Sequence, residues 1–162
     1  MTPERVIAEA RNWLGTPYRH QGRQRTVAVD CIGLVFGVMH AVGLGSSEFW
    51  IAFNRKHRSY KRVPDGHSLH DIFSLYTPEY PKTQAKPGDV LLICMAGMPR
   101  HTAILSERGS IIHAHSEAHG CIEQPWTDTW YRDTASALNT NSLTVPRKTV
   151  ALSAFTGRGM AG

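Results

Sequence analysis

The stretch VAVDCIGLVFGV, residues 27–38, places Cys31 between a polar segment rich in turn formers and an apolar run. Apolar residues recur at helical spacing after Cys31, and Gly43 and Gly45 follow, so we predict a helix that begins at about Cys31. At the beginning of a helix, free backbone N–H groups and the helix dipole favour a thiolate. Cys31 is therefore a candidate nucleophile, although a free cysteine also packs well as an ordinary buried residue.

The composition is typical of a soluble globular protein. The chain has 162 residues, of which 41% are hydrophobic and 19% charged, so we expect a single domain over residues 1–162. It contains no apolar run long enough to span a bilayer, which predicts no stable membrane insertion. Its amphipathic beginning is unlike a signal peptide. The net charge of +5 favours anionic partners.

The cysteines and the basic residues exclude some classes of protein. Cys31, Cys94 and Cys121 are odd in number and widely spaced, and no C-x-x-C pair exists, which argues against a disulfide framework and a zinc ribbon. We expect Cys94, inside an apolar run, to be inert. Basic residues cluster in FNRKHRSYKRVP, residues 53–64, which is either a nucleic-acid patch or a solvated loop. We favour the loop and expect no nucleic-acid partner.

Periodicity and turn residues predict helices first and strands later, which indicates an α+β fold. The region 46–66 is predicted to be an irregular basic insertion. The predicted elements are helices over 3–14, from about 31 to 42 and within 67–76, strands within 86–95 (buried on both faces), 101–106, 110–116, 120–126 and 149–155, and a frayed tail over 156–162.

Histidines on the predicted strands supply candidates for the base that a nucleophilic cysteine needs. HTAILSERGSIIHAHS, residues 101–116, predicts a hairpin with a three-residue turn at 107–109 and Gly109 in the left-handed conformation. In that register His101, His113 and His115 share one face, with His101 opposite His115 and diagonal to His113.

Two other interpretations of these histidines stay open at this point. They are either ordinary half-buried strand residues, or His113, His115, His119 and Cys121 hold a metal ion. The ligand types suit zinc, but their spacing matches no standard zinc motif. We therefore expect no metal and no cofactor.

Several motifs together resemble the NlpC-type cell-wall peptidases, in particular the branch encoded by phages. In order they are ARNWLGTPYRHQG (10–22), DCIGLV (30–35), KPGDVLLI (86–93), RHTAIL (100–105) and IIHAHS (111–116), and the match covers most of residues 5–126. The resemblance implies a papain-like α+β fold, in which a catalytic cysteine begins a helix packed on a small antiparallel sheet that carries the histidine.

The resemblance also implies a cysteine peptidase or amidase with a Cys-His-His triad. Cys31 would attack amide carbonyls of peptidoglycan stem peptides, His101 would be the base, and His113 would orient His101. The hairpin register by itself favours His115 as the third residue, and we follow the family pattern. Members need no cofactor. The resemblance to the phage branch also implies synthesis in the bacterial cytoplasm without a signal peptide, and association with a phage tail whose other proteins are partners.

The family's substrate pocket corresponds to Tyr18 and Asp30, with the Cys31 backbone N–H and the Tyr18 hydroxyl as donors to the oxyanion. Ile32 departs from the many members with serine at this position, where the aspartate and serine hold the terminal ammonium of the stem peptide. We therefore expect a weaker demand for a free amino terminus. The chain beyond about residue 130 does not align, and a non-catalytic structural tail-assembly component with the same fold is the alternative function.

Overall fold

A six-stranded antiparallel sheet organises the part of the chain that the computed structural model describes, residues 2–57, 59–61, 68–74 and 77–140. The strand order is β3-β8-β4-β5-β6-β7, and β1 and β2 form a separate two-stranded ribbon. The strands are β1 (Arg23–Gln24), β2 (Ala28–Val29), β3 (Glu79–Tyr80), β4 (Val90–Met95), β5 (Met98–Leu105), β6 (Ser110–His115), β7 (Gly120–Pro125) and β8 (Thr134–Leu138). The helices are α1 (Pro3–Arg11), α2 (Cys31–Ala41), α3 (Ser47–Lys56), α4 (Ser68–Ser74), the 3₁₀ turn η1 (Lys82–Gln84) and α5 (Asp128–Asp133).

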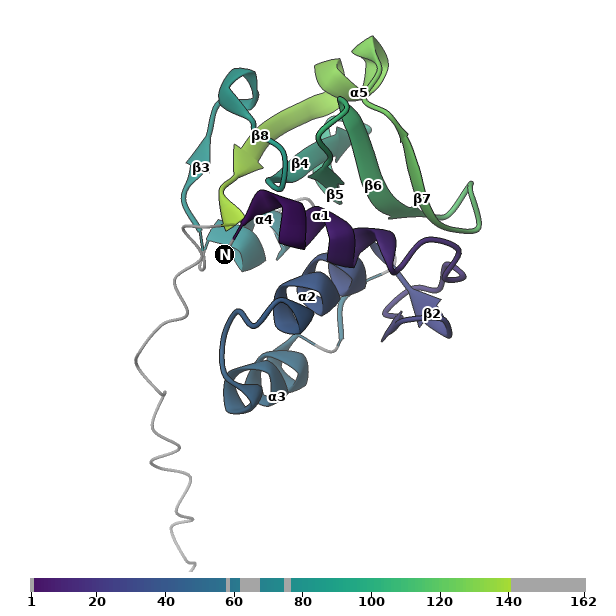
Figure 1. Ribbon diagram of the computed structural model, residues 1–162, viewed down its shortest axis with the longest axis vertical. Helices are drawn as coiled ribbons and strands as arrows, with labels where there is room; N and C mark the ends of the chain where they lie inside the picture. The colour runs from purple at the N-terminus through teal and green to yellow at the C-terminus, as the bar shows by residue number, and fades with distance from the viewer. Residues whose placement is uncertain (1, 58, 62–67, 75–76, 141–162) are drawn as a thin grey trace, which may run out of the picture.

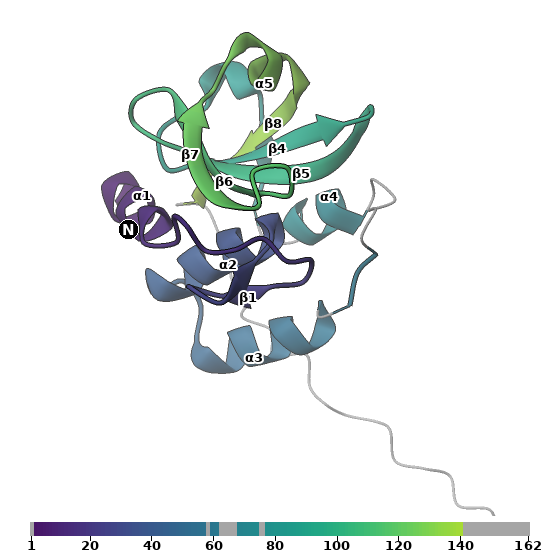
Figure 2. The ribbon, with the colours of Figure 1, turned by 90° about the vertical axis from the view of Figure 1, so that its right-hand side faces the viewer.

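Helices cover both faces of the sheet. Helices α1 and α2 lie on one face and α5 on the other, while α3 packs on the side of α2 that is turned away from the sheet (Figures 1 and 2). The α+β class predicted from the order of the elements is confirmed. Within the described ranges, none of the helices has the length and apolar character to cross a membrane.

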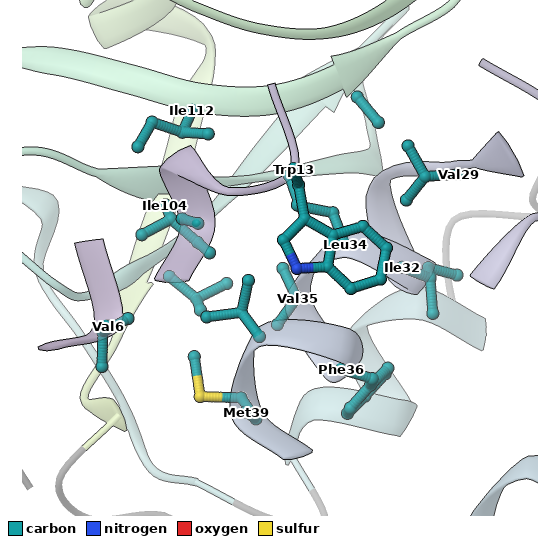
Figure 3. Packing of buried hydrophobic residues seen from close by; sticks show 14 of the residues in the cluster. Val6, Trp13, Val29, Ile32, Leu34, Val35, Phe36, Met39, Ile104 and Ile112 are labelled. Atoms are coloured by element: carbon teal, nitrogen blue, oxygen red, sulfur yellow. The ribbon is translucent and has the colours of Figure 1, made fainter. Parts of the chain in front are cut away.

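The main hydrophobic core lies between α1, α2 and the sheet. Leu34 and Met39 of α2 and Ile104 and Ile112 of the sheet are fully buried there, and Trp13 lies among them (Figure 3). A second, smaller core on the opposite face of the sheet is completed by aromatic residues near α5. Strand β4 contributes to both cores, so the prediction of a strand buried on two faces is confirmed.

The β5–β6 hairpin has the predicted turn. Ile104 pairs with Ile112, the Ser106 amide donates to the Ser110 carbonyl at 2.8 Å, and Gly109 has a φ of +64°. Turn chemistry therefore set this register correctly, because only one residue of the loop has to adopt the left-handed conformation that glycine tolerates.

The prediction of an irregular insertion over 46–66 is wrong for its first half, which forms α3. Ser46 caps the helix, its hydroxyl accepting from the Phe49 amide at 3.2 Å, and Trp50 and Phe53 bury one side of it against α2. The basic residues of α3 lie on the outer side. In the sequence, the many basic residues of this region made it look like a loop, although Trp50 and Phe53 have the three-residue spacing of one face of an amphipathic helix.

The sequence also failed to predict the end of the sheet. The structure has α5 and β8 after residue 126, and β8 inserts between β3 and β4. The sequence of β8, TASAL, contains three small residues and has no alternation that would reveal a strand. The predicted strand at 149–155 and the tail at 156–162 lie outside the described residues.

Candidate active site at the beginning of α2

Cys31 is the first residue of α2, as predicted. Asp30 caps the helix, and its Oδ1 accepts a hydrogen bond from the Gly33 amide at 2.8 Å. On the other side, the Thr102 hydroxyl of β5 donates to the Cys31 carbonyl at 3.1 Å. Since Thr102 follows His101 in the chain, this bond joins the beginning of α2 to the strand that carries the candidate base.

The Cys31 thiol is held in its neutral form. Burial, and secondly the negative charge of Asp30, raise its pKa to about 12. The amide and hydroxyl of Thr102 and the amide of Ile32, which lie against the sulfur, oppose this rise without cancelling it. Position at a helix terminus alone predicted a lowered pKa, and the burial of the thiol together with the neighbouring carboxylate outweighs that effect.

His101 and His113 form a buried pair. Nε2 of His101 and Nδ1 of His113 share a hydrogen bond of 2.7 Å. His101 is 4% exposed and His113 is 0% exposed. Burial, with the positive charges of neighbouring histidines as the second cause, holds the pKa of His101 well below its usual value and lowers that of His113 to about 4. Both imidazoles are therefore neutral at pH 7, and one proton lies between them.

The third histidine of the face, His115, makes ring contacts instead. Its ring centroid lies 5.6 Å from that of His101 and 5.3 Å from that of His113. His113, and not the His115 that the predicted hairpin register favoured, thus makes the hydrogen bond to His101.

A β-bulge lies next to His101. The pairing of β4 and β5 shifts by one residue between Ile93↔His101 and Cys94↔Pro99, which leaves Arg100 as the extra residue. Bulges bend a strand and change the direction of the side chains beside them. This one occurs where the chain passes from the half-buried beginning of β5 to the His101–Thr102 segment that meets α2.

Tyr18 and Asp30 both lie near the beginning of α2, but the Asp30 carboxylate already accepts hydrogen bonds from other groups of the protein. Tyr18 forms a bridge with Val29, and its amide donates to the His119 carbonyl at 2.9 Å. Asp30 is 2% exposed, and its Oδ2 accepts from the Gln21 amide at 2.7 Å and from the Tyr60 hydroxyl. With the bond from the Gly33 amide, this carboxylate has three protein donors.

Tyr60 is a residue of the site that sequence reasoning missed. Its carbonyl accepts from His20 Nε2 at 3.0 Å and from Gln21 Nε2 at 2.9 Å, so the residue is fixed at both ends. Arg23 donates to Asn54 and to the His57 carbonyl, which ties the end of α3 to the same loop. The only signal in the sequence was an aromatic residue within a basic stretch, and it was assigned to a solvated loop.

The same contacts weaken the nucleic-acid interpretation of residues 53–64. Phe53 is buried against Phe36, and Tyr60 is turned toward Asp30, so neither ring is presented for stacking on bases. Residue 58 and residues 62–64 of this stretch lie outside the described residues.

The metal interpretation fails on strand geometry. Cys121 pairs with Ala114 and is buried in the core beneath the helices, whereas His113 points to the other face of the sheet. His119 is exposed in the β6–β7 turn. Among the described residues no group of three or more histidine, cysteine, aspartate or glutamate side chains is arranged to hold a metal ion.

Comparisons with known proteins agree with this architecture. The model of the NlpC/P60 family matches residues 15–139. Tail tip assembly protein K of Escherichia phage lambda is 32% identical over 112 residues, which are 66% of this chain and 51% of that protein. The chain thus spans about half the length of this curated relative.

Solved structures show the same fold. The NlpC/p60 domain of the peptidoglycan hydrolase SagA superposes with a TM-score of 0.58 and 22% identity, covering 86% of this chain and 99% of that one. RipD from Mycobacterium tuberculosis, described as a non-catalytic NlpC/p60 domain protein with an adaptation to peptidoglycan binding, gives a TM-score of 0.56 and 17% identity, covering 88% and 96%.

Proposed function

The chain belongs to the NlpC/P60 family, and on that premise we propose that it is a cysteine peptidase that hydrolyses amide bonds in peptidoglycan stem peptides. One observation carries the proposal. Cys31 begins a capped helix and is bonded through Thr102 to the strand whose His101 shares a buried hydrogen bond with His113. Nucleophilic catalysis requires a thiol together with an oriented base, and the bond from Thr102 brings the beginning of α2 to the strand that carries such a base.

The chemistry follows from the protonation states. The Cys31 sulfur attacks the amide carbonyl while its proton passes to Nδ1 of His101, because both groups are neutral before the reaction. The oxyanion that forms lies near the free N–H groups of the helix terminus, with the Cys31 amide and the Tyr18 hydroxyl as donors. His101 then gives the proton to the leaving amine, and water hydrolyses the resulting thioester, releasing the acid and regenerating the thiol.

His113 has a supporting role in this scheme. Through its bond to Nε2 of His101 it fixes the direction of the ring and helps to stabilise the imidazolium that forms during attack. We therefore expect His101→Ala to be as damaging as the loss of Cys31, and His113→Ala to be less damaging. A larger loss in His115→Ala than in His113→Ala would contradict this assignment.

The tail association is part of the proposal. The lambda relative is a tail tip assembly protein, which supports a location in a phage tail and contact with other tail proteins. The net charge of +5 suits an approach to anionic cell-wall polymers.

A non-catalytic role is the second candidate, and RipD shows that the fold occurs without catalysis. Two observations favour it. The raised pKa of Cys31 lowers the fraction of the thiol that is present as thiolate, and the Asp30 carboxylate already accepts a hydrogen bond from Tyr60, so it is less available to a substrate. This candidate predicts binding to peptidoglycan without release of new amino groups.

Kinetics on a soluble stem peptide separate the two candidates. Wild-type protein should release a new amine, Cys31→Ala should release none with its fold retained, and Cys94→Ala should keep nearly the full rate. Cys94 is the matched control because it is a partly exposed strand cysteine away from α2. Full hydrolysis by Cys31→Ala, or saturable binding with no hydrolysis by the wild type, would overturn the proposal.

A further inference from the structure

Trp130 of α5 contacts all three histidines of the β5–β6 face. Its ring centroid lies 5.1 Å from that of His113, 5.7 Å from that of His115 and 6.0 Å from that of His101. The planes of Trp130 and His113 are almost perpendicular, at 87°. None of the sequence motifs includes this residue.

The hydrogen bond between His101 and His113 permits two arrangements of protons. If His101 carries its proton on Nε2, its Nδ1 has a free lone pair and His113 carries its own proton on Nε2. If instead His113 carries its proton on Nδ1, then His101 is protonated on Nδ1 and cannot accept a proton there. Only the first arrangement leaves His101 able to act as a base toward Cys31.

The atom that distinguishes these arrangements is buried without a partner. Nε2 of His113 has no hydrogen-bond partner among the described residues. In the first arrangement it is an N–H group, and in the second it is a bare lone pair. Aromatic faces are electron-rich, so a neighbouring indole attracts an N–H group and repels a lone pair.

We propose that Trp130 is a positioning residue for this pair, whose indole face accepts the Nε2–H of His113 and thereby keeps Nδ1 of His101 free to take a proton. The proposal rests on the proposed function for its catalytic consequence, but not for its structural content. The same indole face also lies beside the positive charge that develops when His101 takes the proton, and aromatic faces stabilise cations.

Helix α5 is held firmly enough to present Trp130 in this way. Nζ of Lys82 donates to the carbonyls of Tyr131, Arg132 and Thr134 at 2.7, 3.0 and 2.7 Å, at the end of the helix. The Thr134 hydroxyl donates to the Trp130 carbonyl at 2.7 Å. The backbone of Trp130 is thus fixed from η1 and from β8.

Nitrogen-15 NMR of labelled histidines tests the tautomers directly, without a substrate. In the wild type at pH 7 both His101 and His113 should carry the proton on Nε2. Trp130→Leu keeps an apolar side chain and removes the aromatic face, so it should produce a mixture of tautomers. Trp130→Phe should restore most of the wild-type pattern, and Thr129→Ala at an exposed position of the same helix should change nothing.

Activity provides a second measurement. General base catalysis contributes about 100- to 10,000-fold, so a partly misplaced proton should lower kcat about tenfold in Trp130→Leu and leave KM within about twofold. If Trp130→Leu does not fold, Lys82→Met releases the end of α5 and should produce the same tautomer mixture to a smaller extent.

Two results would overturn the inference. One is a wild-type protein with the proton on Nδ1 of His101, and the other is a folded Trp130→Leu with unchanged tautomers. If the tautomers respond as expected but the wild type hydrolyses no stem peptide, the inference stands and the proposed function fails.

Discussion

At the scale of single residues, the pKa values of Cys31 and His101 are shifted in opposite directions, and both shifts favour the neutral form of the group. Burial and Asp30 raise the pKa of the thiol to about 12, and burial lowers the pKa of His101. A preformed thiolate–imidazolium pair is therefore disfavoured in the resting protein. In the proposed reaction, both groups are therefore neutral at the start, and His101 removes the proton as the sulfur attacks.

This protonation state predicts the pH dependence of kcat/KM on a stem peptide. The base is active while His101 is neutral, so the acid limb should lie below the ordinary histidine pKa of 6.5. Because the neutral thiol is the reacting form, the rate should not rise through the ordinary cysteine pKa of about 8.5. A rate that increases tenfold between pH 7.5 and pH 9, as thiolate titration would produce, contradicts the neutral mechanism.

Under the proposed function, the contact between Tyr60 and Asp30 predicts how strongly the protein prefers a substrate with a free amine. The carboxylate already accepts the Tyr60 hydroxyl, and Ile32 cannot form a hydrogen bond, so rates on free and acetylated stem peptides should differ by less than about a hundredfold. Tyr60→Phe frees one lone pair of Asp30 and should increase the preference for the free amine.

The exposed Tyr131→Phe is the matched control for this comparison, because its phenol is remote from Asp30. An equal preference in the wild type and Tyr60→Phe would show that the Asp30 carboxylate takes no part in substrate selection. A wild-type preference above a hundredfold would show that recognition of the free amine is intact despite Ile32.

At the scale of elements, two glycines let other segments approach α2 closely. A Cβ atom at Gly33 would lie 2.0 Å from the Gly22 carbonyl oxygen, and one at Gly37 would lie 2.3 Å from the Trp13 ring. Gly33 therefore allows the loop that carries Gln21 to lie against the beginning of the helix. That contact places the Gln21 amide on Asp30.

Gly33→Ala should displace this loop, because the neighbour is backbone and cannot rotate away. We expect a loss of about 1–3 kcal/mol in the free energy of unfolding in urea, as is typical of overpacking, together with lower activity. Ala41→Ser, at the exposed end of the same helix, should change the free energy by less than about 0.5 kcal/mol. Stability of Gly33→Ala equal to that of the control would mean that the loop is not constrained as described.

The elements also show what the sequence could and could not predict. Helix α2 and the β5–β6 hairpin were predictable because each has a local signal, apolar periodicity in one and a glycine turn in the other. Strand β8 and the contact of Tyr60 with Asp30 depend on neighbours far away in the chain, and no local pattern records them. His101 and His113 could be proposed as partners, but Trp130 could not, since it comes from a short helix after the aligned motifs.

At the scale of the whole molecule, the buried histidines link stability to pH. Burial lowers the pKa of His113 to about 4 in the folded protein, from the ordinary histidine value of 6.5 that applies in the unfolded chain. Between pH 6.5 and pH 4 the unfolded chain therefore binds a proton at His113 that the folded protein does not bind. As a result, the free energy of unfolding decreases as the pH falls through this range. For His113 alone this loss amounts to about 3 kcal/mol, and His101 acts in the same direction.

Urea unfolding at several pH values measures this linkage. His113→Gln should make the free energy of unfolding less dependent on pH between 6.5 and 4, whereas His40→Gln, at an exposed position of α2, should keep the wild-type dependence. Parallel curves for the wild type and His113→Gln would show that His113 is not held neutral by burial.

The mass spectrum of soluble fragments released from purified peptidoglycan tests the central claim most directly. With the wild type we predict fragments in which one amide bond of the stem peptide has been cut with the addition of one water, and none of these fragments with Cys31→Ala. The same fragments from Cys31→Ala, cuts only in the glycan strands, or no fragments from the wild type would contradict the account.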